Sequence, residues 1–477
     1  MIASPHRLAS EAGAQVLREG GNAIDAVIAA DAVLCVVYPH MTSVAGDLMA
    51  IVWPAGASAP VGLVGAGRSG ELATIDAVRQ RGHSQMPERG VLSVTVPGTV
   101  EAWGRLIERF GSLGWTPLLE PAMGMARDGW EVTPHVSEAL HEAADLLSKE
   151  PTAQTLYPSA EPGTRLRNPD LASVLGDIAR HGFNGFYRGE IAATIAAAIA
   201  KRDGFLTARD MANHRSEWVE TVTIPYRDVV VHELPPPTQG LIALNLLRLL
   251  SPHSDLRPGP KFAATFAAAT RAAYGIRDQI TDPDFAAAPS PVTADVPDGG
   301  DTCYLCAADE HGNLVSLIQS VAFDFGSGIV AEGTGMLLQN RGSYFSLDPN
   351  HANRLEPKKR TRHTLIPALA TRDGKPWLLF GSMGGDGQPQ LQTQVLINIV
   401  DHKLELQEAL ARPRLRLTPD GGTLTVEASY AGAEDLGEVM PAGHHSFGHA
   451  HAIVIDGPGT WRAGFDPRSD GSVETVD

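Results

Sequence analysis

The sequence predicts an α+β protein, because helical and strand patterns occupy different parts of its 477 residues. Between residues 97 and 201, apolar residues recur at helical spacing and turn residues separate the runs. Short apolar runs such as residues 48–53 have the length and composition of buried strands. Residues 303–308 and 314–320 flank a turn at 310–313 and form the clearest hairpin pattern of the chain.

The N-terminal half is predicted to begin with two helices and a strand. Apolar residues at helical spacing mark the first helix, which ends at the Gly-Gly-Asn run at 20–22. Residues 23–37 are almost entirely apolar and predict a buried second helix. A loop over 38–47 then leads to the strand at 48–53. Further helices are expected at 99–110, 171–180 and 191–200.

Strands and helices continue up to a marked change in composition. We expect strands at 222–224 and 229–232, and helices at 241–250 and 262–274. The tract 282–301 contains four prolines and ends in Asp-Gly-Gly-Asp, which predicts a mobile surface segment. The hairpin begins directly after it.

The hairpin sets the neighbours of its first residue, Thr302. If the turn is centred on His311 and Gly312, Thr302 lies opposite Ser320 or Val321, to within one step of register. A hydroxyl group is therefore expected beside Thr302.

Composition and charge exclude several classes of partner. The net charge of -17 makes nucleic acid and anionic lipid surfaces poor partners. The apolar run 23–37 carries Asp25 and Asp31 and is too short to span a bilayer. The first residues lack the pattern of a secretory signal, so a cytoplasmic location is expected.

Cysteine and histidine usage indicates no metal site. There are three cysteines, too few for a disulfide framework and consistent with a reducing compartment. Cys303 and Cys306 lie three apart on a predicted strand, so their side chains face opposite sides. The histidines at 444, 445, 449 and 451 lack a cysteine or carboxylate to complete a ligand set. No metal ion or other cofactor is expected.

A threonine placed between a flexible acidic-glycine tract and a strand has a specific chemical use. Cleavage of the Asp301-Thr302 bond frees an α-amine whose low pKa lets it act as base for the threonine's own hydroxyl. The alternative is a β-branched residue that merely begins a strand. The position of Thr302 alone does not decide between the two.

Several motifs spread along the chain settle which interpretation is stronger. They are SPHRLASEAG at 4–13, GGNAIDA at 20–26, VPGTV at 96–100, PPPTQG at 235–240, GSMGG at 381–385 and DPRSDG at 466–471. In this order and spacing, and over nearly its whole length, the chain resembles the γ-glutamyltransferase family.

The resemblance implies a four-layer αββα sandwich of the N-terminal-nucleophile hydrolase type. It also implies autocatalytic cleavage of a zymogen into a large chain, 1–301, and a small chain, 302–477, which remain associated in one intertwined unit. Thr302 falls at the family's nucleophile, and Ser320 at a hydroxyl that contacts the threonine amine. Gly384 and Gly385 fall on the glycine pair whose amides hold the oxyanion.

At the glutamate-binding positions the sequence departs from the family. Ile75 stands at the place of an arginine that binds the α-carboxylate, although alignment is loose there. Tyr344 replaces an aspartate and Ala322 an asparagine, both of which bind the α-ammonium group. A serine pair reads as His363-Thr364. Losing such contacts weakens γ-glutamyl recognition, since each buried charge partner is worth about 2–5 kcal/mol.

The acyl group is therefore expected to be a small carboxylate rather than glutamate. Arg341 and His363, with Tyr344 and Thr364, are the candidate substrate-binding residues, and Arg341 offers a bidentate fork. The family includes such variants, among them oxamate amidohydrolase and cephalosporin acylases that accept dicarboxylic acyl groups. The predicted function is self-processing threonine amidohydrolysis of an oxamate-like or dicarboxylic amide.

Two alternatives stay open. One is a genuine glutathione hydrolase or γ-glutamyltransferase, with a place in glutathione metabolism and acyltransferase activity. The other is an unprocessed, inactive family member. Beyond a small-molecule amide and the association of the two chains, the one partner considered is a second copy, in a homodimer of the processed heterodimer.

Three loops near the expected active site can also be compared with the family. Residues 346–357 are shorter than the family's active-site lid, which predicts a more open pocket and favours hydrolysis over transfer. The basic run 358–362 is expected to be a solvated loop beside the active site. The linker before Thr302 is short and the family's opening strand is missing, and either feature is expected to impair folding or self-cleavage.

Overall fold

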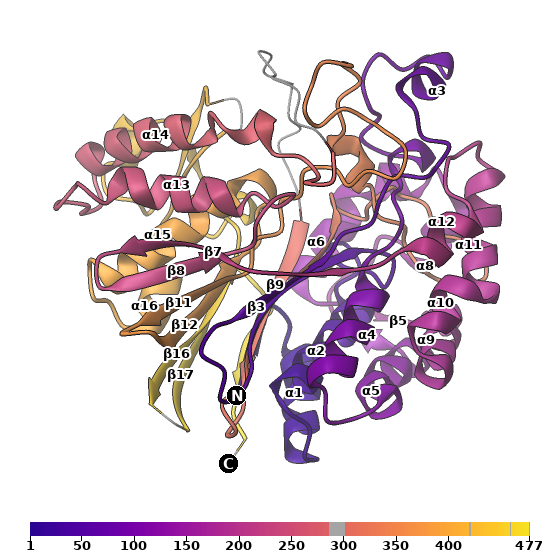
Figure 1. The fold of residues 1–477 in the computed structure, drawn as a ribbon, viewed down its shortest axis with the longest axis horizontal. Coiled ribbons are helices and arrows are strands. Elements are labelled where there is room, and N and C mark those ends of the chain that lie inside the picture. The colour runs from indigo at the N-terminus through magenta and orange to yellow at the C-terminus, as the bar shows by residue number, and fades with distance from the viewer. Residues whose placement is uncertain (286–300, 419–420, 458, 477) are drawn as a thin grey trace.

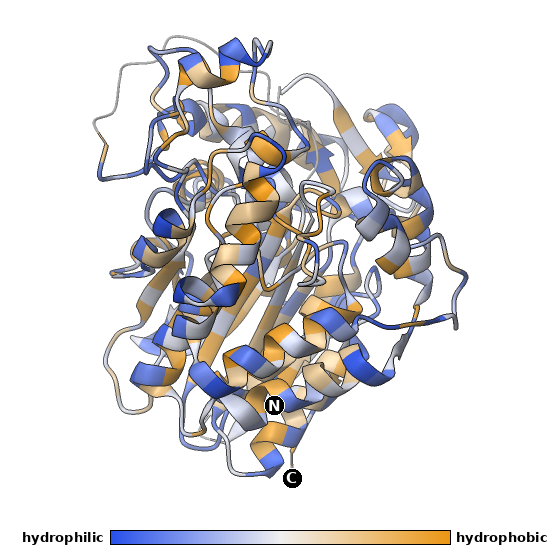
Figure 2. Cartoon of the chain, turned by 90° about the vertical axis from the view of Figure 1, so that its right-hand side faces the viewer, coloured by the Kyte–Doolittle hydropathy of each residue, from blue (hydrophilic) through white to orange (hydrophobic). Residues whose placement is uncertain are grey.

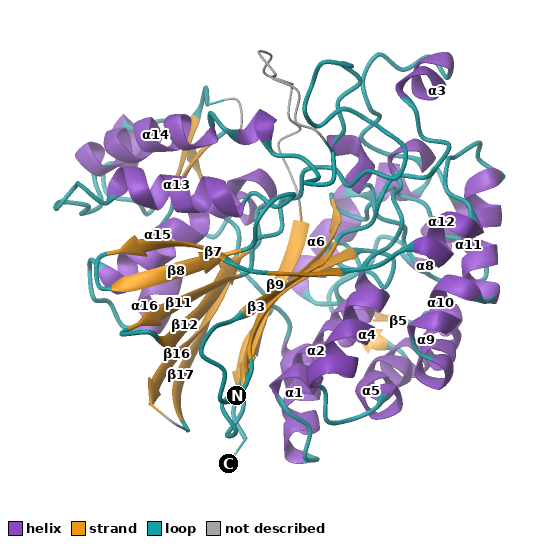
Figure 3. Cartoon of the chain, in the orientation of Figure 1, coloured by secondary structure: helices purple, strands orange, loops and turns teal. Residues whose placement is uncertain are grey.

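Two antiparallel sheets lie face to face, and helices cover the outer face of each (Figure 1). The computed structural model describes residues 1–285, 301–418, 421–457 and 459–476. One apolar cluster lies between the first sheet and its helices, one between the two sheets, and one between the second sheet and its helices. Figure 3 shows the same helix–sheet–sheet–helix order by secondary structure. The predicted α+β class and the four-layer sandwich are confirmed.

The first sheet has seven strands among the described residues, in the order β18-β1-β9-β10-β2-β3-β6. Their bounds are β1 Ile2–Ser4, β2 Asp47–Trp53, β3 Val61–Gly65, β6 Glu217–Val219, β9 Asp301–Ala308, β10 Leu314–Ala322 and β18 Ser472–Glu474. The expectation that the opening strand is missing was wrong. Residues 2–4 form β1, which pairs with β18 on one side and β9 on the other.

The second sheet has six strands within the described ranges, in the order β17-β16-β12-β11-β8-β7. Their bounds are β7 Val222–Tyr226, β8 Val229–Glu233, β11 Ala368–Arg372, β12 Lys375–Ser382, β16 Ala450–Gly457 and β17 Thr460–Phe465. Two small sheets lie outside the sandwich, formed by β4 Trp130–Glu131 with β5 Arg165–Leu166, and by β13 Leu415–Leu417, β14 Leu424–Glu427 and β15 Glu438–Met440.

Helices form the two outer layers. On the side of the first sheet they are α1 Arg7–Arg18, α2 Ala23–Val37, α3 Ile75–Gln80, α4 Thr99–Phe110, α5 Trp115–Asp128, α6 Pro134–Glu142, α7 Ala144–Leu147, α8 Pro151–Leu156, α9 Pro169–His181, α10 Phe183–Arg188, α11 Glu190–Ala200 and α12 Ala208–Asn213. On the side of the second sheet they are α13 Gly240–Leu250, α14 Pro260–Tyr274, α15 Gln388–Val400 and α16 Leu406–Ala411. None of the helices in the described ranges is long and apolar enough to cross a membrane.

Helix α2 is the central element of the first helical layer. Every residue of α2 is buried, as its apolar sequence predicts. The side chain of Asn22 accepts from the backbone N–H groups of Ile24 and Asp25, while Asp25 accepts from the Asn22 N–H, so the N-terminus is closed by a capping box. Figure 2 shows apolar residues on the inner strands and mixed apolar and polar residues on the outer helices.

The predicted elements are confirmed, with small differences at their ends. The helices expected at 23–37 and 99–110 match α2 and α4 in both bounds, and the strand at 48–53 gains Asp47 at its start. The helices expected at 171–180, 191–200, 241–250 and 262–274 are α9, α11, α13 and α14, and the strands at 222–224 and 229–232 are β7 and β8. Of the tract predicted to be mobile, residues 286–300 lie outside the described residues.

The basic run at 358–362 is not the solvated loop that its composition suggested. Lys359, Arg360 and Arg362 are at most 5% exposed. Arg360 pairs with the buried carboxylate of Asp282 at 2.8 Å, and Arg362 with that of Asp386 at 2.5 Å. Lys358 is exposed, whereas carboxylates distant in sequence neutralise Arg360 and Arg362, so these two residues are part of the interior.

Candidate active site

Thr302 lies on β9, in the middle of the first sheet, and its side chain is fully buried in the intact chain. The β9–β10 ladder pairs Cys303 with Gln319 and Asp301 with Ala322, with a register shift between these two pairs. Thr302 therefore faces a bulge that contains both Ser320 and Val321. The predicted register is confirmed, and both residues named as partners share the position opposite Thr302.

A glycine-rich loop follows β12 and closes on the nucleophile strand. Gly384 has a φ of +131° and precedes the 3-10 helix Gly385–Gly387, which runs directly into α15. Only glycine adopts this conformation readily. At the first position of α15, the Gln388 side chain donates from Nε2 to Thr302 Oγ1 at 3.5 Å. The loop that carries the predicted oxyanion glycines thus meets the predicted nucleophile.

Gln388 was not singled out in the sequence. Its Oε1 also accepts from the Ile366 N–H at 3.3 Å, so the side chain links Thr302 to the segment after Thr364. A signal was available, because Gln388 follows Gly385 by three residues. Glutamine before proline on its own does not indicate a site.

The motif PPPTQG at 235–240 forms hydrogen bonds to the glycine loop and to the segment 363–364. Gln239 is fully buried, and its Nε2 donates to the backbone oxygens of Thr364 and Gly385, each at 2.9 Å. Its backbone N–H donates to the carbonyl of His363 at 3.0 Å. This one residue therefore ties the glycine loop to the segment 363–364.

Arg341 is a buried cation with incomplete hydrogen bonding. Its side chain is 1% exposed, and Nη1 donates to Thr364 Oγ1 at 3.0 Å. Nε and Nη2 have no hydrogen-bond partner among the described residues. Burial lowers the pKa of the guanidinium, and the neighbouring Tyr344 and Asp47 oppose that shift only in part. A buried guanidinium in this condition is suited to an anionic ligand.

Tyr344 lies beside this guanidinium. The Arg341 Cζ is 4.9 Å from the centre of the Tyr344 ring, and the Cζ of Arg362 is 5.2 Å from it. Phe323 stacks on the ring at 5.7 Å between centres. The hydroxyl is buried without a hydrogen-bond partner in the described part of the chain, and burial raises its pKa to about 12. At neutral pH it is a donor that the fold leaves unused.

His363 does not offer a ring nitrogen to a substrate in this structure. The Leu365 N–H donates to Nδ1 at 3.3 Å, and Nε2 lies 3.1 Å from Asp47 Oδ2. Burial, and then the charges of Arg341 and Arg362, hold the pKa of His363 far below its usual range. The ring is therefore neutral and carries its proton on Nε2. Direct binding of a carboxylate by His363, which the sequence suggested, does not fit these contacts.

Asp47 was missed by the sequence analysis. It is fully buried at the start of β2, and the β2–β10 ladder pairs it with Ser320. Its Oδ1 accepts from the Gly67 N–H at 2.9 Å and from Gln339 Nε2 at 3.0 Å. Burial raises its pKa to about 7, although these hydrogen bonds and the charge of Arg341 oppose the shift. No sequence pattern marks a single aspartate after a glycine.

The contacts join the candidate residues into one circuit. Thr302 contacts Gln388, which follows the loop of Gly384 and Gly385, and Asp386 of that loop pairs with Arg362. From Arg362 the circuit passes through the Tyr344 ring to Arg341 and Thr364. It returns through His363 and Asp47 to Ser320, opposite Thr302. Of the positions compared with the family, Ile75 lies outside the circuit, packed on α3 against Leu347 and Leu355.

The loop 346–357 packs onto the molecule. Leu347 and Leu355 are buried, and Ser346 and Asn353 are joined by a backbone hydrogen bond of 2.9 Å. In the intact chain Thr302 is 0% exposed and Arg341 1%, and the more open pocket stays a prediction for the cleaved protein.

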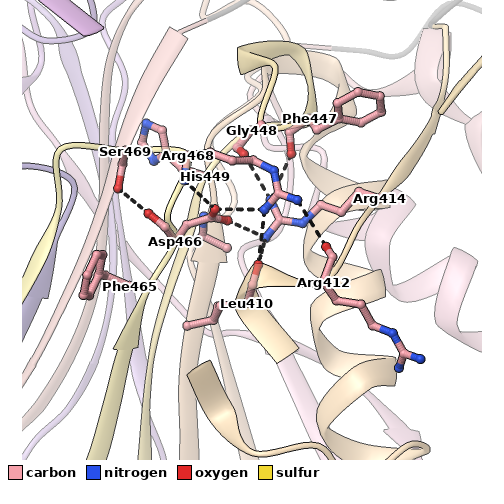
Figure 4. Close-up of polar contacts among 12 residues, drawn as sticks. Leu410, Arg412, Arg414, Phe447, Gly448, His449, Phe465, Asp466, Arg468 and Ser469 are labelled. Carbon is pink, nitrogen blue, oxygen red and sulfur yellow. Dashed lines mark hydrogen bonds and ion pairs between the residues drawn. The ribbon is translucent and has the colours of Figure 1, made fainter. Parts of the chain in front are cut away.

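The DPRSDG motif forms a charged network behind the glycine loop (Figure 4). Asp466 pairs with Arg414 at 2.5 Å and with Arg468 at 2.9 Å. Arg414 Nη1 also donates to the carbonyls of Phe447 and Gly448, at 2.9 and 3.0 Å. The network therefore holds the backbone next to Ser382 and Met383, which immediately precede Gly384.

The cysteine and histidine groups behave differently from ligand sets. Cys303 belongs to the cluster beneath the helices and Cys306 to the cluster between the sheets, which confirms that they face opposite sides. His449 and His451 have ring centres 5.5 Å apart, and His444 stacks on His445 at 4.2 Å. Within the described residues no three His, Cys, Asp or Glu side chains are arranged to hold a metal ion.

An αββα sandwich with a buried threonine on a central strand, beside a glycine loop, is the architecture of an amidohydrolase of the N-terminal-nucleophile type. The family model for gamma-glutamyltranspeptidase matches residues 9–296 and 289–476. The chain belongs to this family and is a self-processing amidohydrolase.

Named relatives extend the comparison. The chain is 36% identical to a glutathione hydrolase-like proenzyme (YwrD) of Bacillus subtilis and 34% identical to an oxamate amidohydrolase proenzyme of Klebsiella pneumoniae, covering 99% of this chain and 97% of each relative. The crystal structure of a cephalosporin acylase from Bacillus halodurans superposes with a TM-score of 0.90 at 34% identity, covering 100% of this chain and 95% of that one. Relatives that are proenzymes imply a processed heterodimer of large and small chains.

Proposed function

We propose that this protein hydrolyses the amide bond of a small acyl group that carries a carboxylate, as an oxamate-like or dicarboxylic amide does. Thr302 is the nucleophile, freed by cleavage of the Asp301-Thr302 bond into chains of 301 and 176 residues. The buried, underbonded guanidinium of Arg341 is the observation that carries the proposal.

The energetics of Arg341 favour a carboxylate ligand. A buried charge that lacks partners destabilises the folded state by several kcal/mol, and a bound anion that pairs with Arg341 would offset this cost. In the described residues no carboxylate lies within 4 Å of Arg341, since Asp47 is committed to His363 and Asp386 to Arg362. Nε and Nη2 together present the fork that binds two carboxylate oxygens.

A γ-glutamyl substrate, which carries an α-ammonium group, fits the surroundings of Arg341 less well. An α-ammonium group needs an acceptor or an anion, and the position that resembles the family's aspartate holds Tyr344. The hydroxyl of Tyr344 keeps its proton at neutral pH because burial raises its pKa to about 12. Ala322, at the place of an asparagine, offers no side-chain acceptor. This is the reason to place γ-glutamyl substrates second.

The circuit of contacts supports the following reaction. After processing, the Thr302 α-amine takes the proton from Oγ1, and Oγ1 attacks the amide carbonyl. The backbone N–H groups of Gly384 and Gly385 stabilise the oxyanion, a role in which one donor is worth about 3–4 kcal/mol. The amine gives its proton to the leaving nitrogen, and water then releases the acid from the acyl-threonine. Ser320, opposite Thr302, is placed to hold the amine.

Two named relatives support the same substrate class. One is described as an oxamate amidohydrolase and one as a cephalosporin acylase, and both are similar to this chain over almost its full length. Oxamate is an amide with an adjacent carboxylate. The glutathione hydrolase-like relative supports the second candidate, a γ-glutamyl substrate.

The first test asks whether the chain processes itself. A mass of 50.6 kDa divided in proportion to 301 and 176 residues gives fragments of about 32 and 19 kDa. Wild-type protein should show both fragments by denaturing gel and intact mass, whereas Thr302→Ala should remain one chain. A wild-type protein that stays in one piece after prolonged incubation would support the inactive alternative.

The second test compares matched amides on processed protein. Oxamide carries a second carboxamide in place of the carboxylate of oxamate, and succinamide does so relative to succinamate. Initial rates of ammonia release report hydrolysis before the acid formed from each diamide accumulates. We expect the anionic member to be preferred, and Arg341→Lys to remove most of the preference because a lysine lacks the fork. Arg127→Met, an exposed site, is the matched control. Faster turnover of γ-glutamyl-p-nitroanilide than of either anionic amide would favour the glutathione hydrolase alternative.

A further inference from the structure

Asp47 and His363 form a buried hydrogen-bonded pair that joins two parts of the site. Asp47 begins β2 and is the ladder partner of Ser320, so it belongs to the nucleophile side. His363 immediately precedes Thr364, which binds Arg341, so it belongs to the carboxylate side. The bond from His363 Nε2 to Asp47 Oδ2, 3.1 Å long, connects them.

We propose that Asp47 is the positioning residue of the carboxylate subsite, acting through His363 to set the distance between Arg341 and the nucleophile Thr302. The inference rests on the proposed function, because it takes Arg341 as the group that binds the substrate carboxylate. It assigns no direct contact with substrate to Asp47 or to His363.

Position 47 requires a carboxylate because the groups around it are all hydrogen-bond donors. Leu365 donates its N–H to Nδ1 of His363, so the ring proton is on Nε2 and points at Asp47. Gly67 and Gln339 also donate to Asp47. Three donors therefore converge on two oxygens. Above its pKa of about 7, the ionised Asp47 carboxylate accepts all three, whereas an amide would place its own NH₂ against one of them.

Among the described residues, the main-chain hydrogen bonds of the segment 363–364 all come from Pro237 and Gln239. His363 donates its N–H to Pro237 at 2.8 Å, and Gln239 binds the carbonyls of His363 and Thr364. These contacts come from the segment that leads into α13. The imidazole of His363 is the contact that reaches across to β2, and therefore to the strands that carry Ser320 and Thr302.

Breaking this contact should affect one part of the substrate more than the other. With the imidazole released, Thr364 and Arg341 can shift relative to Thr302, while Thr302 and the glycine loop keep their own bonds. A substrate whose amide carbon lies at Thr302 would then no longer reach Arg341 with its carboxylate, so the complex would lose that binding contact. Binding of anionic amides should weaken, and neutral amides should be nearly unaffected.

The experiment measures kcat and KM for oxamate and oxamide, or for succinamate and succinamide if those are hydrolysed faster. In processed Asp47→Asn protein we expect KM for the anionic amide to rise about 10- to 100-fold, by analogy with the loss of a residue that orients a metal ligand, with kcat changed much less. KM for the neutral amide should stay within about twofold. Asp31→Asn, a buried aspartate that bonds Trp103 outside the circuit, is the matched control.

Variants of His363 keep the test decisive if Asp47→Asn fails to fold or to process. His363→Gln retains an N–H near the place of Nε2 and should stay close to wild type, whereas His363→Leu should raise KM as Asp47→Asn does. The double variant Asp47→Asn/His363→Leu should be no worse than either single one, because both remove the same bond.

Three results would overturn the inference. They are equal effects of Asp47→Asn on the anionic and neutral amides, additive effects of the two single substitutions, and a His363→Gln variant as impaired as His363→Leu. Failure of the proposed function is recognised separately, because wild-type protein would then show no preference for the anionic amide at all.

Discussion

Arg414 offers a test of how far the charged network behind the glycine loop supports catalysis. Its side chain is 1% exposed and makes four contacts shown in Figure 4: to Asp466 and to the carbonyls of Leu410, Phe447 and Gly448. Arg414→Met keeps most of the buried volume but removes the charge and every one of these bonds. Asp466 would retain its contact with Arg468 at 2.9 Å.

The loss of stability can be worked from these contacts. Removing one partner of a buried ion pair costs about 3–5 kcal/mol. At about 2.1 cal/mol/K per residue, a chain of 477 residues unfolds with an entropy of about 1 kcal/mol/K. If it unfolds as one unit, Tm should fall by about 3–5 °C.

The same substitution should reduce kcat. The carbonyl of His449 accepts from Met383 N–H at 3.0 Å and from Ser382 Oγ at 3.2 Å, directly before Gly384. When Arg414 no longer holds the preceding carbonyls, the glycine loop loses support. We expect kcat to fall about tenfold, short of the 10²- to 10³-fold loss of a whole oxyanion donor. KM should change little.

Differential scanning fluorimetry and steady-state kinetics on the best amide measure both effects. Arg412→Met is the matched control, since its side chain points away from the network in Figure 4 and, within the described part of the chain, makes one long hydrogen bond of 3.4 Å to Asn398. Arg414→Lys should recover part of the Tm but little of the kcat, because a lysine cannot reach both carbonyls and Asp466. A Tm and kcat equal to those of Arg412→Met would refute the reasoning.

Three smaller predictions concern other buried groups. Burial raises the pKa of Asp31 from its ordinary value of 3.8 to about 8, so the folded state should lose stability as pH rises between these values. Asp31→Asn keeps an acceptor for Trp103, and thermal melts from pH 5 to pH 8 should show a smaller decrease in Tm for this variant than for wild type. Tyr344→Phe removes a hydroxyl without a partner among the described residues, so Tm should hold while KM for the anionic amide rises about two- to tenfold, the net worth of one hydrogen bond. Gly384→Ala forces a side chain at φ +131° with its Cβ 2.5 Å from Leu391 Cδ1, and single-turnover rates should fall about 10²-fold.

Local chemistry explains which elements could be predicted from the sequence. Helix α2 carries its start signal in Asn22 and Asp25 and its burial in an apolar composition, so nearby residues determine both of its ends. The β9–β10 hairpin depends on a tight turn, and counting outward from that turn is enough to place Thr302 opposite Ser320 and Val321. The bulge between Gln319 and Ala322 was not predicted, because packing rather than the turn determines where a bulge forms.

The residues whose burial or role was not predicted form their contacts with partners far away in the sequence. Arg360 and Arg362 were expected in solvent because their sequence neighbours are basic, yet their carboxylate partners lie 78 and 24 residues away. Asp47 meets His363 across 316 residues. Charge pairing at such separations is decided by the fold, and periodicity within a single sequence carries no information about it.

The arrangement of strands also bears on how a cut chain would stay together. In the first sheet, β9 and β10 lie between β1 and β2, so strands of the proposed small chain alternate with strands of the large one. In the second sheet the strands of the two chains meet at one boundary, where β11 of the small chain pairs with β8 of the large chain. Asp282 on one side of the proposed cut pairs with Arg360 on the other. Separating the chains would break ladders in both sheets and expose the apolar layer between them, so cleavage before Thr302 should leave a heterodimer that comes apart only on unfolding.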